Sequence, residues 1–96
     1  MNDRHVAEVA KLLKTMAHPI RLKILCLLQD GEMTVGEIHR QVQTTNANVS
    51  QHLNILRNQG IIDYRKDANF IHNRIIEGRV VEMIKIMREL FCSEEG

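Results

Sequence analysis

The sequence predicts a mainly α-helical domain with a small β-hairpin, in the order α-α-α-α-β-β-α. Apolar residues recur every three or four positions through most of the chain, which is the spacing of one face of a helix. One Pro and five Gly leave few residues that would interrupt helices. Residues 62–76 instead begin with alternation and contain the turn signal Asp67-Ala68-Asn69. Ninety-six residues of 44% apolar composition are expected to form one domain, residues 1–96.

Three helices are expected in the first half of the chain. The first covers residues 4–16, and the second starts at Pro19, a residue that suits the first helical turn, and ends at about residue 29. Thr34 and Glu37 have the spacing of a capping box, in which each side chain bonds the backbone of the other residue. A third, short helix should therefore begin there and end near Val42.

The second half should hold a longer helix, the hairpin and a last helix. Thr45 is placed to cap the fourth helix, and Gly60 is a favoured residue just past a helix end. The hairpin spans residues 62–76, and the last helix covers residues 78–92. Because this last helix is apolar on nearly every side, it needs cover on more than one face. In so small a domain, we expect a second copy of the chain to supply that cover.

The fourth helix carries an unusual polar face. Val49, Leu53 and Leu56 form its buried stripe, while amides and hydroxyls replace the Lys and Glu that usually cover a surface helix. A solvated helix face is the alternative explanation for any single one of these residues. The candidate contact residues at the start of this helix and on its outer face are Thr45, Asn46, Ala47, Asn48, Ser50, Gln51 and Asn54.

A short helix, a turn, a second helix and a charged hairpin follow in the order of a winged helix-turn-helix. In that architecture the second helix enters the major groove of DNA, where Asn, Gln, Ser and Thr can bond base edges. Arg57, Arg65 and Lys66 are expected to contact phosphates, which position a protein without specifying sequence. Residues 39–74 hold five basic and two acidic side chains, a net charge of +3. Double-stranded operator DNA is therefore the expected partner.

Three segments, "LLKTMAHPIRLKILCLL", "VGEI" and "SQHLNILRNQGII", resemble the ArsR/SmtB winged-helix repressors across nearly the whole chain. The resemblance implies a bacterial homodimer, paired through its first and last helices, that leaves its operator when an inducer binds. It also implies that His52 packs or meets the DNA backbone instead of binding a ligand. The hairpin departs from the family pattern at His72-Asn73, where a tyrosine is common, and at the tip 67–69, which lacks the usual glycine.

The metal-binding residues of the family are missing at the matching positions. Thr34 and Gly36 stand where metal-sensing members carry a Cys-x-Cys pair, and the last helix has Glu82 and Glu89 but no His. Since zinc sites need several nitrogen or sulfur ligands at fixed spacing, we expect no metal and no cofactor.

Cys26 and Cys92 resemble the thiol pair of the sulfide-responsive and redox-responsive branch of the family, the HlyU/BigR/SqrR type. The resemblance implies sensing of sulfane sulfur species or an oxidant. The two thiols would become linked within a subunit, by a disulfide or a longer sulfur bridge, and DNA binding would weaken. On helical wheels Cys26 lies about 200° from Ile24 of the main apolar stripe, and Cys92 lies off the centre of the stripe of the last helix, so that both could face a shared crevice. The alternative is that each thiol is a small buried hydrophobe.

Two other functions remain open at this point. One is a repressor with a metal inducer bound at an unconventional site, and the other is a winged-helix protein-interaction module that does not bind DNA. An enzyme is not expected, because no nucleophile–base pair, Gly-rich phosphate loop or paired carboxylate stands out. A cytoplasmic location is expected, since no apolar run is long enough to span a bilayer and the N-terminus does not read as a signal peptide.

Overall fold

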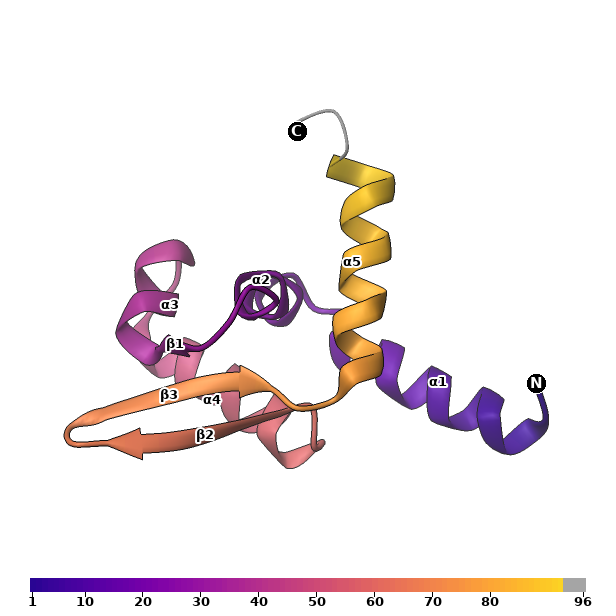
Figure 1. The fold of residues 1–96 in the computed structure, drawn as a ribbon, viewed down its shortest axis with the longest axis horizontal. Helices are drawn as coiled ribbons and strands as arrows, with labels where there is room; N and C mark the ends of the chain where they lie inside the picture. The colour runs from indigo at the N-terminus through magenta and orange to yellow at the C-terminus, as the bar shows by residue number, and fades with distance from the viewer. Residues whose placement is uncertain (93–96) are drawn as a thin grey trace.

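The structure, a computed structural model, describes residues 1–92, so residues 93–96 of the predicted domain lie outside the described part. The elements are α1 (Asp3–Met16), α2 (Pro19–Leu28), β1 (Met33–Thr34), α3 (Val35–Gln41), α4 (Asn46–Asn58), β2 (Ile62–Asp67), β3 (Phe70–Ile75) and α5 (Gly78–Cys92) (Figure 1). The predicted fold class is confirmed. Only the two-residue strand β1 was missed, because so short a strand has no alternation to detect.

The helix boundaries follow from local chemistry. Pro19 occupies the first turn of α2, and Thr34 and Glu37 form the predicted capping box at the start of α3. The Thr45 hydroxyl accepts from the backbone N–H of Asn48 at the start of α4. Gly60 follows that helix with a φ of 73°, a conformation that glycine adopts without steric cost.

The strands form one antiparallel sheet in the order β1-β3-β2, so that β3 is the central strand. Ile62 pairs with Ile75 and Tyr64 pairs with Asn73 across β2 and β3. We call these two strands and their turn the wing. Ala68, the first residue of the two-residue turn, has a φ of 54°, in the region where glycine is usual.

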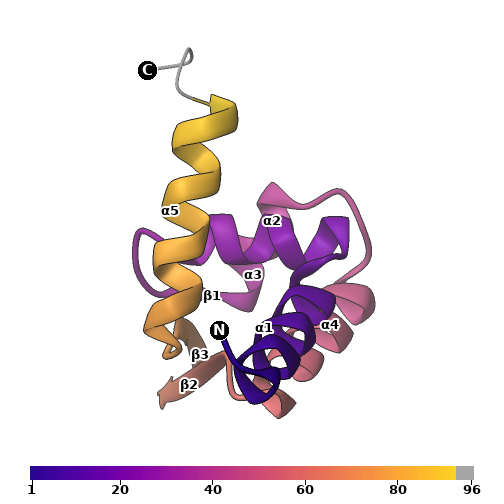
Figure 2. The ribbon, with the colours of Figure 1, turned by 90° about the vertical axis from the view of Figure 1, so that its right-hand side faces the viewer.

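The core lies where α2, α3, α4, the base of the wing and the first half of α5 meet (Figures 1 and 2). Side chains from all of these elements are buried, and α1 adds one at its C-terminal end. The buried apolar residues are Met16, Ile24, Leu25, Leu28, Ile38, Val42, Val49, Leu53, Leu56, Ile61, Ile62, Val80 and Ile84.

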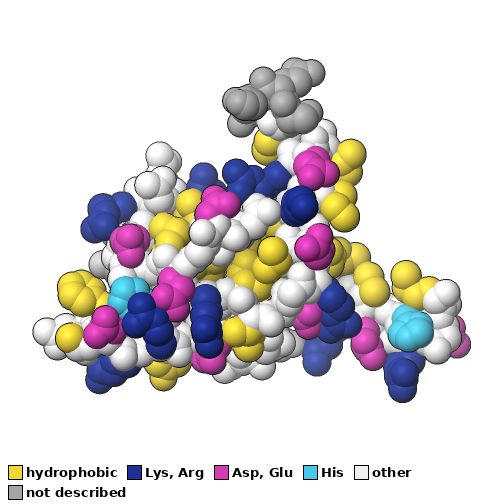
Figure 3. All heavy atoms as spheres, in the orientation of Figure 1, with side chains coloured by type: hydrophobic (Ala, Val, Ile, Leu, Met, Phe, Trp, Pro, Cys, Tyr) yellow, Lys and Arg dark blue, Asp and Glu magenta, His cyan; other side chains and the backbone are white. Residues whose placement is uncertain are grey.

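Helix α1 and the second half of α5 project from this core (Figures 1 and 2). Hydrophobic side chains lie in solvent along both projecting parts, as the space-filling view shows (Figure 3). No helix within residues 1–92 has the length and apolar composition that a membrane crossing requires. The large exposed apolar residues of the two helices are Val6, Val9, Leu13, Ile86, Leu90 and Phe91.

Candidate functional site

Helix α4 presents its polar residues on the side away from the core. Its stripe of Val49, Leu53 and Leu56 is buried, as the spacing predicted. Asn48 is half-buried, and its side-chain amide donates to the hydroxyl of Thr44 at 2.9 Å. Asn48 therefore helps to hold the helix start, whereas the rest of the row is free to meet a partner. The exposed members are Asn46, Ala47, Ser50, Gln51 and Asn54.

The turn between α3 and α4 is held by side chains from both sides. The His39 ring nitrogen Nε2 lies 2.8 Å from the carbonyl oxygen of Thr44. Thr45 accepts from the backbone N–H of Asn48 at 3.1 Å, so its hydroxyl caps the helix. These bonds fix α4 relative to α3, which is what a helix-turn-helix needs in order to present one helix to a groove.

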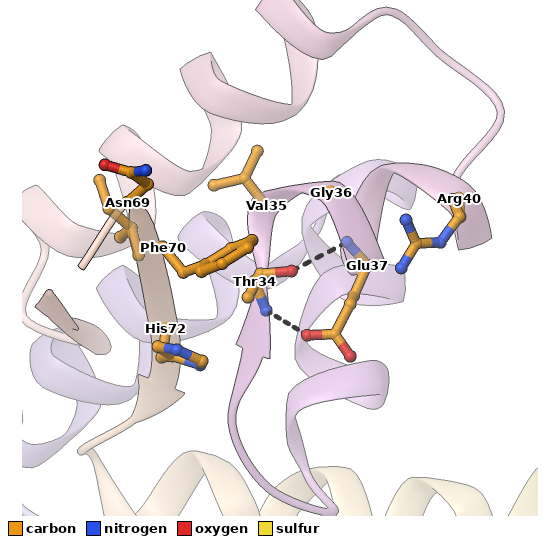
Figure 4. A pocket seen from close by; sticks show the side chains of 9 residues that line it. Thr34, Val35, Gly36, Glu37, Arg40, Asn69, Phe70 and His72 are labelled. Atoms are coloured by element: carbon orange, nitrogen blue, oxygen red, sulfur yellow. Dashed lines mark hydrogen bonds between the residues drawn. The ribbon is translucent and has the colours of Figure 1, made fainter. Parts of the chain in front are cut away.

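An open groove of about 580 Å³ lies between the start of α3 and the tip of the wing (Figure 4). Phe70 and His72 line its wing side, and Arg40 lines its α3 side. Within this groove the Thr34 hydroxyl and the Glu37 carboxylate bond each other's backbone N–H groups, at 3.1 and 2.9 Å. The segment that holds thiolates in metal-sensing members thus serves as a helix cap here. Residues 1–92 contain no group of three or more His, Cys, Asp or Glu side chains that could hold a metal ion.

The three cations predicted to contact phosphates lie in different surroundings. Arg65 pairs with Glu32 at 3.0 Å and lies 3.8 Å from Asp67. Lys66 is exposed and makes no ion pair with any residue of the described chain. The Arg57 guanidinium is half-buried and bonds Asn54 of its own helix and a residue of the wing.

Asn73 is the functional candidate that sequence reasoning missed. Its side chain is fully buried and joins Arg57 to the backbone of β1. The available signal was the departure from the family pattern at His72-Asn73. An amide at an inward position of an alternating strand needs buried hydrogen-bond partners.

His52 packs inside the protein, as expected. It is 7% exposed, its ring centroid lies 4.3 Å from that of His18, and its Nδ1 lies 3.2 Å from Nη1 of Arg21. Burial lowers the pKa of His52, and the nearby His18 and Arg21 lower it further. Because a guanidinium can only donate, Nδ1 of His52 must accept, so the ring is neutral with its proton on Nε2.

The two cysteines line one pocket of about 260 Å³ between α2 and α5. Cys26 is half-buried and Cys92 is exposed at the end of α5, and both are free thiols. Burial raises the pKa of Cys26, and the positive charge of Arg88 partly opposes this effect. Arg88 is itself held at the rim, where it donates to the side-chain oxygen of Gln29 at 2.7 Å. The remaining lining residues are Leu22, Ile84, Met87 and Phe91.

Two of the known proteins that resemble this chain are similar to it in both sequence and structure. The family described as "Bacterial regulatory protein, arsR family" matches residues 18–64. The chain is 36% identical to the biofilm growth-associated repressor of Xylella fastidiosa over 93 residues, 97% of this chain and 82% of the relative. It is 36% identical over 90 residues to the transcriptional activator HlyU of Vibrio cholerae, covering 94% of this chain and 83% of that protein.

Solved structures of these two relatives are also similar to the structure of this chain. The crystal structure of the transcriptional repressor BigR from Xylella fastidiosa has a TM-score of 0.88 at 36% identity and covers 94% of this chain and 92% of that chain. The structure of reduced HlyU from Vibrio cholerae has a TM-score of 0.90 at 36% identity and covers 94% of this chain and 95% of that chain.

Proposed function

Because the chain belongs to the arsR family of bacterial regulatory proteins and resembles HlyU and BigR, we propose that it is a homodimeric transcriptional repressor whose operator binding is switched off by linkage of Cys26 and Cys92. Its role as a DNA-binding transcriptional regulator follows from the family. The proposal adds the dimer, the thiol switch and the direction of regulation. One domain, residues 1–96, would carry all three.

The exposed face of α4 supports DNA reading. Apart from Ala47, its exposed residues carry amides or hydroxyls, which can donate and accept at base edges, and none of them carries a charge. The exposed Lys66 on the wing would contact a phosphate, a contact that fixes position and not sequence.

The projecting helices support a dimer. Leu90 and Phe91 are 71% and 85% exposed, an arrangement that costs free energy for every apolar side chain left in water. In a two-fold dimer, α1 and α5 of each copy would cover α1 and α5 of the other, because both copies use the same surface. Two copies of α4 would then meet two half-sites of an operator.

The observation that carries the switch is the single apolar pocket shared by Cys26 and Cys92. Apart from Arg88 and the thiols, the pocket is lined by hydrocarbon and the thioether of Met87, surroundings that suit uncharged sulfane sulfur. The exposed Cys92 can meet a reagent first, since the burial that raises the pKa of Cys26 disfavours its thiolate.

The proposed chemistry uses thiol exchange. The Cys92 thiolate attacks the outer sulfur of an organic persulfide, which forms a Cys92 persulfide and releases the organic thiol. The Cys26 thiolate then attacks Sγ of Cys92, so that a disulfide forms and hydrosulfide leaves. If Cys92 carries one more sulfur, attack by the Cys26 thiolate on the sulfur between Sγ of Cys92 and the terminal S–H expels hydrosulfide and leaves a trisulfide bridge. Either bridge ties α2 to α5 and would shift the two copies of α4 relative to each other.

The test is binding of the purified protein to its own upstream DNA, reduced and then treated with polysulfide, at one salt concentration. Tight binding by the reduced protein and loss after treatment are expected, with Cys26→Ser and Cys92→Ser each resistant to treatment. If reduced protein binds and treatment changes nothing, the thiol switch is wrong and a metal inducer becomes the leading alternative. If reduced protein binds no DNA at any salt concentration, the operator-binding part is wrong.

The direction of regulation needs a second readout, because one relative is named a repressor and the other an activator. A reporter gene behind the upstream DNA should rise when the gene for this protein is deleted. A fall would assign an activating role and overturn the repressor part of the proposal.

A further inference from the structure

Arg57 lies at the junction between α4 and the wing, and its guanidinium faces the protein. Nη1 donates to Oδ1 of Asn54 at 2.7 Å, and Nη2 donates to Oδ1 of Asn73 at 3.0 Å. The guanidinium carbon lies 4.5 Å from the centroid of the Tyr64 ring, within the range of a cation–π contact. One side chain of α4 thus holds both strands of the wing.

The partners on the wing face the same way. Tyr64 and Asn73 pair directly across β2 and β3, so their side chains lie on one face of the sheet. The amide nitrogen of Asn73 donates to the carbonyl oxygen of Met33 at 3.4 Å, which extends the connection to β1. We call Arg57, Tyr64 and Asn73 the clamp.

The clamp also sets the direction of two amides. Because a guanidinium has donors only, both Asn54 and Asn73 must turn their oxygen atoms towards Arg57. The nitrogen of Asn54, which lies on the exposed face of α4, is then left to donate outwards. Nε of Arg57 is buried and has no hydrogen-bond partner among the described residues, so this edge of the guanidinium is closed to a phosphate.

We infer that Arg57 is a positioning residue, which fixes the wing and the Asn54 amide relative to α4, and not the phosphate contact that the sequence suggested. The inference rests on the proposed operator binding. Two of the five N–H groups of Arg57 bond amides and a third, on Nε, is buried, so that at most two remain for a phosphate. Without the clamp, the wing can change its angle to α4. Because the wing and α4 must fit the same DNA, this change would weaken operator binding.

Salt dependence separates positioning from phosphate contact. The experiment measures operator affinity against salt concentration for Arg57→Lys, Arg57→Gln and the control Lys66→Gln. A lost phosphate contact changes the slope of log affinity against log salt by about 0.9. Lys66→Gln should give a shallower slope.

Arg57→Lys keeps the charge but cannot reproduce the fork, so it should lose roughly tenfold in affinity, the effect of one charged hydrogen bond, at the wild-type slope. Arg57→Gln should lose at least as much affinity. Wild-type affinity in Arg57→Lys, together with a shallower slope in Arg57→Gln, would make Arg57 a phosphate contact and overturn the inference.

A second readout needs no DNA. Tyr64 is the only tyrosine and the chain has no tryptophan, so tyrosine fluorescence reports this ring alone. Loss of the guanidinium uncovers the ring, and quenching by acrylamide should increase in both Arg57 variants but not in Lys66→Gln. Equal quenching in variants whose circular dichroism matches that of the wild type would show that the clamp does not form. If the wild type binds no operator, the proposed function fails, while quenching still decides whether the clamp exists.

Discussion

Hydrogen bonds hold the junction between α4 and the wing, whereas α1 and the second half of α5 leave apolar side chains in water. On the wing side, Arg57 and Asn73 satisfy each other across sixteen positions of sequence. On the other side, Val6 is 52% and Leu90 is 71% exposed. Hydrogen-bonding groups can find their partners within one chain. An exposed apolar face is removed from water only when another apolar surface packs on it. The first region therefore has its final form in one copy, and the second is expected to gain it in two.

The largest effect is expected where the apolar face meets its proposed partner. Leu13→Glu places a charge on the exposed stripe of α1 without touching the core. An uncompensated charge in an interface costs about 3–5 kcal/mol, so the dimer should dissociate at least about a hundredfold more readily. Sedimentation should show single chains with unchanged helix content. Lys14→Glu, one position along the same helix, is the control and should remain paired. A monomeric wild type would contradict the proposed pairing of two copies through these apolar faces.

The hydrogen-bonded side should respond within a single chain. Asn73→Ala leaves the Arg57 guanidinium without its buried acceptor, which costs about 1–3 kcal/mol of unfolding free energy. Urea denaturation at several protein concentrations would measure the loss. The loss should be the same at every concentration, because the bond lies within one copy. Asn69→Ala on the wing tip should have little effect. An equally stable Asn73→Ala variant would show that this region does not depend on its directional bonds.

A smaller gain is expected at the turn of the wing. Ala68 has a positive φ, which costs a residue with a Cβ atom about 1 kcal/mol relative to glycine. Ala68→Gly should therefore raise the midpoint of thermal unfolding by a few degrees. Asn69→Gly, at the neighbouring position where φ is not positive, should not. A loss of stability in Ala68→Gly would mean that the turn differs in solution.

The smallest effect concerns His52 of α4, which contacts His18 and Arg21 at the start of α2. Since burial lowers the pKa of His52, the unfolded chain binds more protons than the folded one as pH falls below about 6.5. The contribution of His52 is fully present above that pH and is lost as pH falls towards the folded-state pKa. Unfolding titrations from pH 8 to pH 5 should show a decline that is weaker in His52→Gln. His5→Gln, at an exposed site, should keep the wild-type profile.

Sequence reasoning succeeded where the determinants are local. The capping box of Thr34 and Glu37, the cap at Thr45 and the position of Gly60 set helix ends through bonds that span only a few residues. It missed β1, which exists only because β3 pairs with it from 38 to 40 positions away.

The inward direction of Arg57 was missed for the same reason. Its partner Asn73 lies on a different element, and nothing near Arg57 in the sequence signals a buried acceptor. The common pocket of Cys26 and Cys92 agrees with the shared crevice that two helical wheels allowed, because both thiols lie away from the centres of the apolar stripes. Their role in sensing stays a prediction.

Helix α5 has fully buried side chains only in its first half, and its second half touches α2 through the cysteine pocket and the bond from Arg88 to Gln29. Val80 and Ile84 are fully buried, while the turns beyond them leave the body of the protein. At 1.5 Å per residue, Cys92 lies about 12 Å along the axis from Ile84, and a tilt of about 5° there moves the free end by about 1 Å. A bridge from Cys92 to α2 would therefore pull on the far end of α5 and tilt the helix about its buried first half. For a given tilt, the displacement of the end of α5 would grow with the length of the part beyond Ile84. The length of this helix is therefore a determinant of the switch that is separate from the chemistry of the two thiols.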